Sequence, residues 1–371
     1  MIYLDYAADT PVSARALDAF CEAARQHSAN PNSVHPLGIK EKAVIDDATA
    51  RIAACLHVLP SEIVHTSGAS ESNNLAIKGI AGQYKKYGKH IITTMIEHAS
   101  ALGPMEYLRT QGFEVDYVRL TRDGQVDIDH LASLLRDETI LVSLSLVDSE
   151  IGIVQDIDPI TRLLASYPHC YLHVDAAQAL GKIAFSLDGI DLLTAAPHKF
   201  YGLVGSGLLV VKEGVLLESQ ILGGQSASAF RSGTPSAALA CSCATALEDA
   251  LDALEGHYNY VKTLNTALRE RLSGLDGVKI NSPVNASPFI LNISVPSIKP
   301  QAMVQALGER GICIASKSAC CPPNSLSRPV YTLTNDRKAA MSTLRISLSH
   351  LTTKEEIEEF LRCFEECLRI L

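Results

Sequence analysis

Residues 171–199 read YLHVDAAQALGKIAFSLDGIDLLTAAPHK and contain two candidate strands, 171–175 and 191–195. Such apolar runs alternate with amphipathic helical patterns over the first two-thirds of the chain, which predicts a mostly parallel sheet with helices on both faces. Ligands of sheets of this kind bind beyond the carboxyl ends of the strands. Asp175 closes the first strand and Lys199 follows the second, so we expect the two side chains to share one site.

An aspartate at a strand end and a lysine just past the next strand are what pyridoxal 5′-phosphate (PLP) chemistry needs. The lysine amine binds the aldehyde of the cofactor covalently, and the carboxylate keeps the ring nitrogen protonated so that the ring accepts electrons. Asp175 or Lys199 alone would be a weak signal, because strand-end aspartates and loop lysines are common. The pair predicts a PLP site because the rest of the chain supplies the other parts that such a site requires.

The length of 371 residues allows two domains, at about 100–200 residues per domain. We expect a large α/β domain at 12–250 and a smaller α+β domain formed by 1–11 and 251–371. An Ala/Leu-rich helical stretch at about 236–272 is expected to bridge them. The other predicted elements are strands at 62–66, 90–94, 139–147, 207–211, 289–295 and 344–348, and helices at 12–27, 128–136, 159–166, 299–310 and after Thr353, which forms a capping box with Glu356.

The composition excludes several classes of function. The net charge is −9 and no basic stripe is present, so a direct nucleic-acid partner is not expected. Residues 1–5 do not resemble the start of a signal peptide, and no apolar run approaches the roughly 20 residues of a membrane span. Ten cysteines without a CxxC motif indicate reduced thiols in the cytoplasm, and they make a metal or redox protein a distant alternative.

Residues 66–74, TSGASESNN, follow a predicted strand and begin a helix. Small residues at such a turn leave backbone N–H groups free, and a helix N-terminus carries about half a positive charge. That geometry suits a phosphate group, which we expect at Ala69 and Ser70. An ordinary helix cap is the alternative for the turn by itself, and the PLP pair favours the phosphate.

Three further residues are candidates for the chemistry. His98 ends another strand at the same sheet edge and could stack on a cofactor ring and exchange protons, although core and surface histidines are common. Arg345 lies inside an apolar strand, where a substrate carboxylate or an internal ion pair would satisfy it equally well. Cys320 is a candidate nucleophile because Lys317 favours its thiolate, while the pair Cys320-Cys321 could also be a redox, metal or packing feature.

Taken in order along the chain, these segments resemble the NifS/IscS-type cysteine desulfurases, fold-type I PLP enzymes of the class V aminotransferase family. The resemblance covers nearly the whole chain. Its motifs are 3–11, 30–35, 66–74, Glu97-His98, 150–155, 173–182, His198-Lys199 with Tyr201-Gly202, 231–234, 316–320 and Arg345. It implies the fold-type I architecture, with a mostly parallel seven-stranded sheet in the large domain.

The resemblance also implies roles for individual residues. Catalytic residues would be Lys199, which holds PLP, His98, which stacks on the ring, and the sulfur-accepting Cys320. The implied cofactor-binding residues are Ala69, Ser70, His98, Ser149, Asp175, Gln178, His198, Lys199 and Thr234, and the implied substrate-binding residues are Asn30 and Arg345. Gln178 would bond the phenolic oxygen of the ring, and Thr234 would reach the phosphate of the partner subunit in a homodimer.

The activity that the resemblance implies is conversion of L-cysteine to L-alanine, with a persulfide on Cys320 carried by a mobile loop at about 316–330. The persulfide would pass to a sulfur-acceptor protein, either an iron–sulfur scaffold or a sulfur carrier, for cluster assembly or tRNA thiolation. Two alternatives stay open. One is a related PLP-dependent lyase acting on selenocysteine or another β-substituted amino acid, and the other is a PLP-binding paralogue of low activity with a regulatory role.

The chain departs from the family pattern at several site positions. Asp148-Ser149 replaces two asparagines, Ala196 replaces a phosphate-binding serine, and Ser70 replaces a threonine. Losing one neutral donor to a phosphate costs about 1.5–3 kcal/mol, which would weaken PLP binding without abolishing it. Asp148 would add negative charge close to the cofactor if its side chain points into the site.

Overall fold

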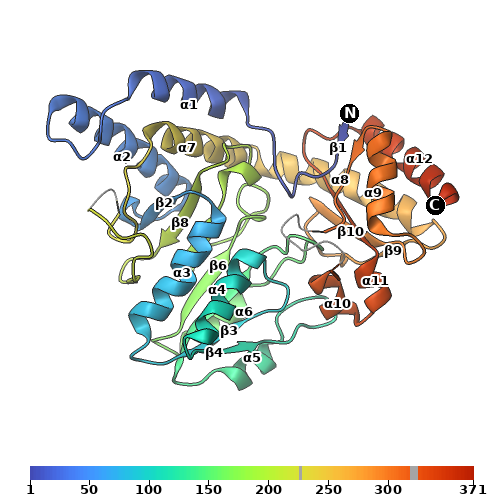
Figure 1. The fold of residues 1–371 in the computed structure, drawn as a ribbon, viewed down its shortest axis with the longest axis horizontal. Coiled ribbons are helices and arrows are strands. Elements are labelled where there is room, and N and C mark those ends of the chain that lie inside the picture. Colours follow the sequence, from blue (N-terminus) through green and yellow to red (C-terminus); the bar gives the residue numbers. More distant parts are fainter. Residues whose placement is uncertain (225–227, 318–324) are drawn as a thin grey trace.

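A seven-stranded sheet forms the centre of the larger part of the molecule (Figure 1). The computed structural model describes residues 1–224, 228–317 and 325–371. The strands of the sheet are β2 (Ile63–Thr66), β3 (His90–Thr93), β4 (Glu114–Tyr117), β5 (Thr139–Ser145), β6 (Tyr171–Asp175), β7 (Leu192–Ala195) and β8 (Gly207–Val211). Their order across the sheet is β2-β8-β7-β6-β5-β3-β4.

The sheet is parallel except for one strand. β8 runs antiparallel to both of its neighbours, β2 and β7, and the remaining neighbours in the sheet are parallel. β5, β7 and β8 are buried along their whole length, as expected for strands covered on both faces. The predicted α/β class with a mostly parallel, seven-stranded sheet is confirmed.

One strand of the sheet was not indicated by the sequence pattern. The predicted strands agree with the observed ones to within two residues at each end, but β4 had no counterpart. β4 pairs only with β3 and lies at the edge of the sheet. Edge strands tolerate charged side chains, and Glu114 and Asp116 interrupt the apolar run from which a strand would be predicted.

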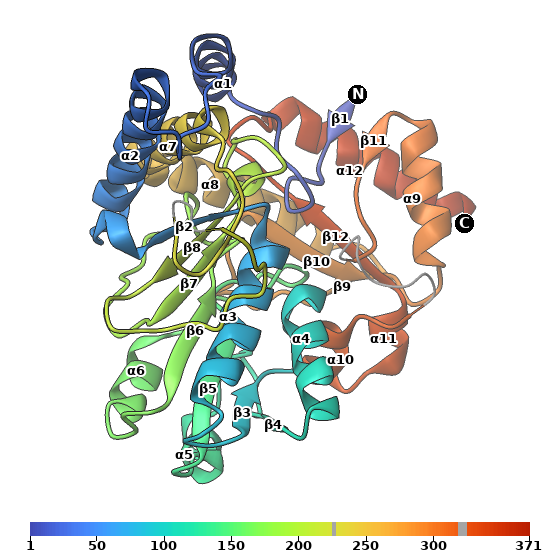
Figure 2. The ribbon, with the colours of Figure 1, turned by 60° about the vertical axis from the view of Figure 1, so that its left-hand side comes forward.

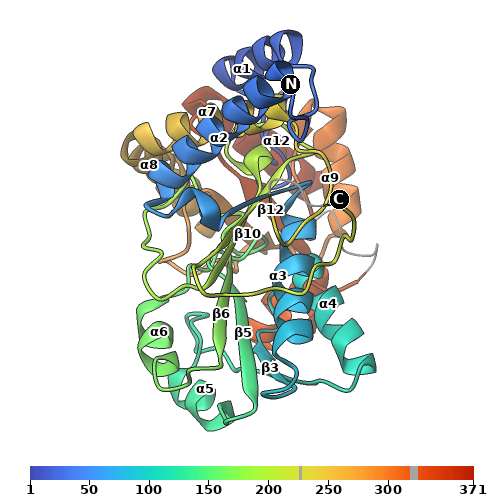
Figure 3. The ribbon, with the colours of Figure 1, turned by 90° about the vertical axis from the view of Figure 1, so that its left-hand side faces the viewer.

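Helices lie on both faces of the sheet. They are α1 (Ala14–Gln26), α2 (Pro36–Leu56), α3 (Ala69–Tyr84), α4 (Ala99–Thr110), α5 (Ile128–Leu134), α6 (Asp158–Leu164) and α7 (Ala237–Asp252). Figure 3 shows β5 and β6 between α6 on one side and α3 and α4 on the other. α7 packs against both α1 and α2, which form a further layer. Throughout the described ranges, no helix is both long and apolar enough to cross a membrane.

The two ends of the chain build the second part of the molecule. Its elements are β1 (Ile2–Tyr3), α8 (Leu254–Ser273), β9 (Lys279–Ile280), β10 (Ile290–Ser294), α9 (Pro300–Glu309), β11 (Ile312–Cys313), α10 (Arg328–Thr334), α11 (Arg337–Met341), β12 (Thr343–Ser347) and α12 (Lys354–Ile370). β12, β10 and β9 form an antiparallel sheet, and β1 pairs with β11 in parallel. Figure 2 shows β1 and β11 together at the same end of the molecule as α9 and α12.

Each part of the molecule has its own hydrophobic core. Leu4 joins buried residues between Val261 and Cys367 in one cluster. The large sheet carries two other clusters, and neighbouring residues such as Leu192 and Leu193 fall into different ones because strand side chains alternate between faces. These separate cores support the predicted division of the chain after residues 11 and 250, which we retain as a proposal. A smaller cluster crosses the division, where Ile96, Ile151 and Ile153 pack with Val330, Ala339 and Ala340.

The helical stretch predicted at 236–272 consists of two helices. α7 ends and α8 begins at Ala253; the stretch 236–272 contains no proline, and its one glycine, Gly256, lies in the first turn of α8. The break follows from packing, because α7 buries its side chains in the core of the large sheet and α8 in the core of the second part. The capping box of α12 is confirmed: the N–H of Glu356 donates to Thr353 Oγ1 at 3.1 Å, and the N–H of Thr353 donates to Glu356 Oε2 at 2.9 Å.

The turn after β6 is tightly packed around Gly181. Its φ is +74°, and an added Cβ would lie 2.9 Å from the Cβ atoms of Phe200 and Ala250. Gly214 has a similar φ of +88° with nothing within 4 Å of an added Cβ. Gly214→Ala should therefore lose only about 1–2 kcal/mol from the strained backbone, while Gly181→Ala should lose about 1–3 kcal/mol more from steric overlap.

The two variants are compared by the free energy of unfolding from urea titrations. Equal losses in both variants would contradict the close approach of Gly181 to Phe200 and Ala250.

Candidate active site

A cavity of about 390 Å³ lies beyond the carboxyl ends of β5 and β6, within the usual size range of small-molecule sites. The predicted site residues that line it are Ala69, Ser70, His98, Ser149, Asp175, Gln178, His198, Lys199 and Arg345. Segments far apart in the chain therefore meet at the sheet edge where the strand pattern predicts a site. Ala7 and Ala8, from the N-terminal segment, complete one wall.

Lys199 follows β7 in a short 3-10 turn, η2 (Pro197–Lys199). The turn begins at a proline and is closed by the N–H of Lys199, which donates to the carbonyl of Ala196 at 3.0 Å. The side-chain Nζ donates to the carbonyl oxygens of Ala7 at 2.9 Å and Ala8 at 2.5 Å. The amine is thus held at the cavity wall by the N-terminal segment.

Asp175 ends β6 and is buried. Its Oδ2 accepts a hydrogen bond from Asn73 Nδ2 at 2.7 Å, and its Oδ1 accepts one from the N–H of Ala177 at 3.0 Å. Asn73 Nδ2 also donates to Ser100 Oγ at 2.8 Å, so one amide connects the carboxylate with the next helix. Asn73 and Ser100 are not among the residues predicted from the sequence, although Asn73 lies in the turn 66–74, where a polar side chain near the strand end is a usable signal.

His98 caps the N-terminus of α4. Its Nδ1 accepts from the N–H of Ser100 at 3.2 Å, and Ser100 Oγ lies 2.8 Å from the same nitrogen. Burial lowers the pKa of His98, the charge of Asp175 opposes that shift, and the charge of Lys199 adds to it. The ring is therefore neutral near pH 7, and because a backbone N–H can only donate, the ring proton is on Nε2.

The phosphate site is predicted at the N-terminus of α3, and this role stays a prediction. Gly68 is the N-cap residue and provides no side-chain cap within the described structure. The residues of this turn that line the cavity are Ser67, Gly68, Ala69, Ser70 and Glu71. Backbone N–H groups at such a terminus attract an anion.

The negative charge of Glu71, in the same turn, is balanced by an ion pair with Arg231. Its Oε1 pairs with Arg231 Nε at 2.9 Å, and its Oε2 accepts from the N–H of Ser67 at 2.7 Å. Burial alone would raise the pKa of Glu71, but the bonds from Arg231 and Ser67 outweigh it and lower the pKa. Arg231 thus offsets the charge of an ionised Glu71 beside the predicted phosphate site at the N-terminus of α3.

Arg345 lies on β12 and is only 2% exposed. Its Nη2 pairs with Asp5 Oδ1 at 2.8 Å, and its Nη1 donates to the carbonyl of Ser149 at 2.8 Å. The internal ion pair that the sequence left open is present, and the guanidinium also lines the cavity. Since a guanidinium has five N–H groups, these two bonds leave donors for a ligand.

Asp148 does not line the cavity. Its Oδ1 accepts from the N–H groups of Glu150 at 3.0 Å and Ile151 at 2.5 Å, which forms a tight turn. Burial, with a further contribution from Glu150, raises the pKa of Asp148 to about 7. Burial likewise raises the pKa of Glu97 to about 8. Near neutral pH Glu97 is therefore mostly protonated, and Asp148 is about half protonated.

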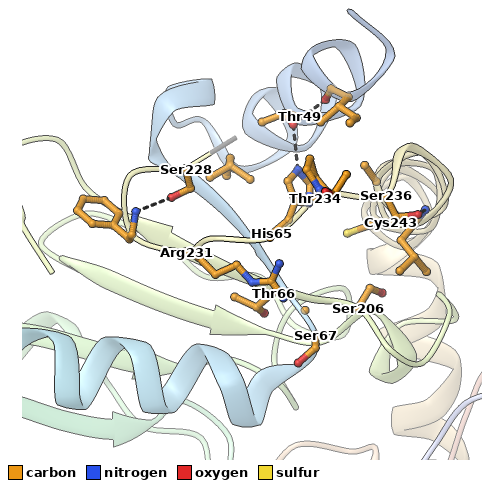
Figure 4. A pocket seen from close by; sticks show the side chains of 18 of the residues that line it. Thr49, His65, Thr66, Ser67, Ser206, Ser228, Arg231, Thr234, Ser236 and Cys243 are labelled. Carbon is orange, nitrogen blue, oxygen red and sulfur yellow. Dashed lines mark hydrogen bonds between the residues drawn. The ribbon is translucent and has the colours of Figure 1, made fainter. Parts of the chain in front are cut away.

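Two residue predictions fall outside this cavity. Thr234 lines a second cavity of about 610 Å³, where Figure 4 shows it together with Arg231 and His65. The second cavity shares Ser67 with the first. Asn30 is exposed in the loop between α1 and α2, and its Oδ1 accepts from the N–H of Asn32 at 2.9 Å. The predicted roles of Thr234 and Asn30 stay predictions.

Cys320 and Cys321 lie outside the described residues, so their roles also stay predictions. The residues that flank them are described. Lys317 is buried, and its Nζ donates to the carbonyl of Ser325 at 2.8 Å and to Ser325 Oγ at 2.6 Å. Ala196, at the position where the family has a serine, is fully buried and does not line the cavity.

The cavity fits PLP. Asp175 offers a carboxylate for the ring nitrogen, Lys199 offers the amine, and the N-terminus of α3 offers N–H groups for the phosphate. Within the described part of the chain, His198 Nδ1 and Arg345 Nε are buried without a hydrogen-bond partner. Unpaired buried polar atoms are costly, so a polar, anionic ligand would stabilise this arrangement. No cluster of side chains suited to a metal ion is present in residues 1–224, 228–317 and 325–371.

The buried Asp148 makes stability depend on pH in a defined direction. Its pKa is raised by folding, so its contribution to stability is complete below the pKa of the unfolded chain and is lost as the pH rises to about 7. Asp148→Asn keeps the acceptor for the turn and cannot ionise. We expect this variant to be more stable than the wild type by on the order of 2 kcal/mol at about pH 8, and by much less at about pH 4.

Urea unfolding at both pH values measures the effect, with Asp123→Asn at an exposed loop position as the matched control. A gain for Asp148→Asn that is the same at both pH values would contradict the burial of an ionisable Asp148.

The chain is similar in sequence and in fold to known proteins. The profile of the family described as aminotransferase class-V matches residues 2–360. The chain is 38% identical over 367 residues to the cysteine desulfurase IscS of Neisseria meningitidis, covering 96% of this chain and 89% of the relative. It superimposes on a solved NifS-like protein with a TM-score of 0.94, 33% identity and full coverage of both chains. It also superimposes on SspA in complex with cysteine, with a TM-score of 0.82, 30% identity and coverage of 95% and 100%.

Proposed function

Since the chain belongs to the aminotransferase class-V family, we infer that it is a PLP-dependent cysteine desulfurase, which converts L-cysteine to L-alanine. The observation that carries this function is the single cavity shared by Lys199, Asp175 and Arg345, in a chain 38% identical to a cysteine desulfurase. A relative of 30% identity whose structure is a complex with cysteine supports cysteine as the substrate.

Different residues of the cavity would bind PLP and the substrate. Lys199, Asp175 and Gln178 would hold the cofactor together with the N-terminus of α3. When bound, PLP supplies an electron sink that weakens the bond between Cβ and Sγ of cysteine. Arg345 binds the substrate carboxylate through its remaining N–H groups. His98 keeps its ring proton on Nε2, since its Nδ1 is engaged by Ser100.

The thiol of Cys320 is the proposed sulfur acceptor. The Cβ–Sγ bond of the substrate breaks, a bond forms between that sulfur and Cys320 Sγ, and the Cβ of the product gains a proton. Cysteine and the thiol of Cys320 thus become alanine and a persulfide, with no external oxidant or reductant. The buried Lys317, bonded to Ser325, fixes the two described residues that flank the segment carrying Cys320.

The partners of the reaction belong to the same proposal. A sulfur-acceptor protein, an iron–sulfur scaffold or a sulfur carrier, takes the sulfur from Cys320. A homodimer is supported by Thr234, which lines the second cavity and not the one that contains Lys199, and which would bind the phosphate of the partner subunit rather than that of its own chain. Asn30 would bind the substrate, as the resemblance to the family implies. The cytoplasm is the proposed compartment because persulfide chemistry needs a reduced thiol.

Incubation with L-cysteine tests the proposed function by measuring alanine, sulfide and the visible absorbance of bound PLP. The wild type should form alanine, Lys199→Ala should lose both the covalently bound cofactor and the activity, and Cys320→Ala should bind PLP but lose sulfur transfer. Cys21→Ala, at a half-buried cysteine of α1, is the matched control and should retain activity. A wild type that binds PLP without forming alanine would refute the desulfurase function. Normal turnover by Cys320→Ala would refute the role of Cys320.

Arg345→Lys tests the contact with the substrate carboxylate. The lysine keeps the charge that faces Asp5 but loses the planar fork. We expect KM for cysteine to rise by about tenfold or more, with a smaller change in kcat, because binding of the carboxylate is weakened in both ground and transition states. Steady-state alanine formation measures both constants. An unchanged KM would mean that Arg345 acts only as the partner of Asp5.

A further inference from the structure

Lys182 is a buried amine next to the site that the mechanism above does not use. It follows Gly181 in the turn after β6, is 5% exposed, and is not among the residues that line the cavity. A buried amine is costly unless it is hydrogen-bonded. Its Nζ donates to Gln178 Oε1 at 2.9 Å, which connects the amine to an amide that lines the cavity.

The amide of Gln178 has only one orientation that satisfies its neighbours. Lys182 Nζ donates on one side, so the amide oxygen must face it. On the other side the carbonyl oxygen of Ala7 lies 2.8 Å from Nε2 and can only accept, so the amide nitrogen must face Ala7. Because one N–H of Nε2 is used by Ala7, the second is available to the cavity that Gln178 lines.

We propose that Lys182 is a positioning residue for the cofactor: it holds and polarises the Gln178 amide so that Nε2 presents an N–H to the phenolic oxygen of the PLP ring. The proposal rests on the proposed function, because it assumes PLP in the cavity. Hydrogen bonds in a chain strengthen one another, so donation by Lys182 makes Nε2 of Gln178 a stronger donor. Without Lys182 the amide oxygen would be buried and unpaired, and the amide would rotate away from the ring.

The charges around Lys182 are consistent with this role. Burial lowers the pKa of Lys182 to about 7, and the positive charges of Lys199 and Arg345 add to the shift. An amine donates to Gln178 Oε1 in its charged and neutral forms alike, so the orientation of the amide does not depend on the charge of Lys182. The same site thereby avoids a third permanent positive charge beside Lys199 and Arg345.

A double-mutant cycle with Lys182→Met and Gln178→Leu tests the proposal. The dissociation constant of PLP is measured by titrating each apoprotein and following the visible absorbance of the bound cofactor. Loss of one hydrogen bond should weaken PLP binding by about three- to tenfold in Lys182→Met. In the Gln178→Leu background the same substitution should have an effect of less than about twofold, because its target is gone. Equal effects in both backgrounds, or no effect of Lys182→Met, would overturn the proposal.

A second readout separates positioning from a general loss of packing. Without the N–H to the ring oxygen, the nitrogen that joins Lys199 to PLP should hold its proton to higher pH. The pH midpoint of the visible absorbance change should therefore rise in Lys182→Met and in Gln178→Leu, and no further in the double variant. An additive rise in the double variant would show that Lys182 acts directly and would also overturn the proposal.

Controls keep the cycle interpretable. Lys42→Met, at an exposed lysine of α2, should leave the affinity for PLP unchanged. Circular dichroism of each apoprotein checks folding. If Lys182→Met does not fold, Lys182→Gln replaces it, since its shorter side chain withdraws the donor from Gln178. The cycle needs no cysteine, so a failure to form alanine would refute the desulfurase function and leave the test of Lys182 intact.

Discussion

The geometry of the site depends on the contacts that the N-terminal residues 5–8 make with three of its side chains. The carbonyl of Ala7 accepts hydrogen bonds from both Lys199 and Gln178, and Asp5 forms the ion pair with Arg345. The amine, the amide and the guanidinium belong to segments that are far apart in the sequence. A short turn at residues 5–8, closed by the N–H of Ala8 on the carbonyl of Asp5 at 2.9 Å, holds all three in one place. This explains why a stretch with little regular secondary structure lines the cavity.

The second constraint is that burial raises the pKa of two carboxyl groups next to the site, Asp148 and Glu97. Asp148 stands where the family has an asparagine, and a carboxylate there would oppose the negative charges of the cofactor. Burial instead favours its protonated form. A protonated carboxyl group has one donor and one carbonyl acceptor, much like an amide, so the turn at Asp148 tolerates the exchange. The buried Glu97 follows the same logic, since it accepts bonds from Thr94 and Ser145 while burial raises its pKa.

Local patterns in the sequence predicted the parts of the structure that depend on short-range order. The buried strands of the sheet, the turn at α3 and the capping box at Thr353 all have signals within a few residues. The edge strand β4 and the break at Ala253 have none, because edge pairing and tertiary packing decide them.

The same division holds for the site. The pair of Asp175 and Lys199 follows from strand ends that meet at one edge of the sheet. The contacts of Asn73 and Lys182, by contrast, are side-chain orientations across helices and turns. They emerge only when the packed structure shows which polar atoms face each other. Asn73 lies 102 residues from Asp175, and Lys182, although only four residues from Gln178, has no local pattern that predicts a buried amine facing that amide.

The pairing of β1 with β11 has a consequence for the synthesis of the chain. Residues 2–3 are synthesised long before residues 312–313, with which they pair, and the N–H of Ala7 donates to Ser347 Oγ at 2.9 Å. Contacts of such high sequence separation form late. The large sheet can fold while translation continues, since domains fold as units from the N-terminal side. The N-terminal segment that positions Lys199 therefore gains these contacts only after residues 312–347 have been synthesised, so a nascent chain cannot assemble a working site before that point.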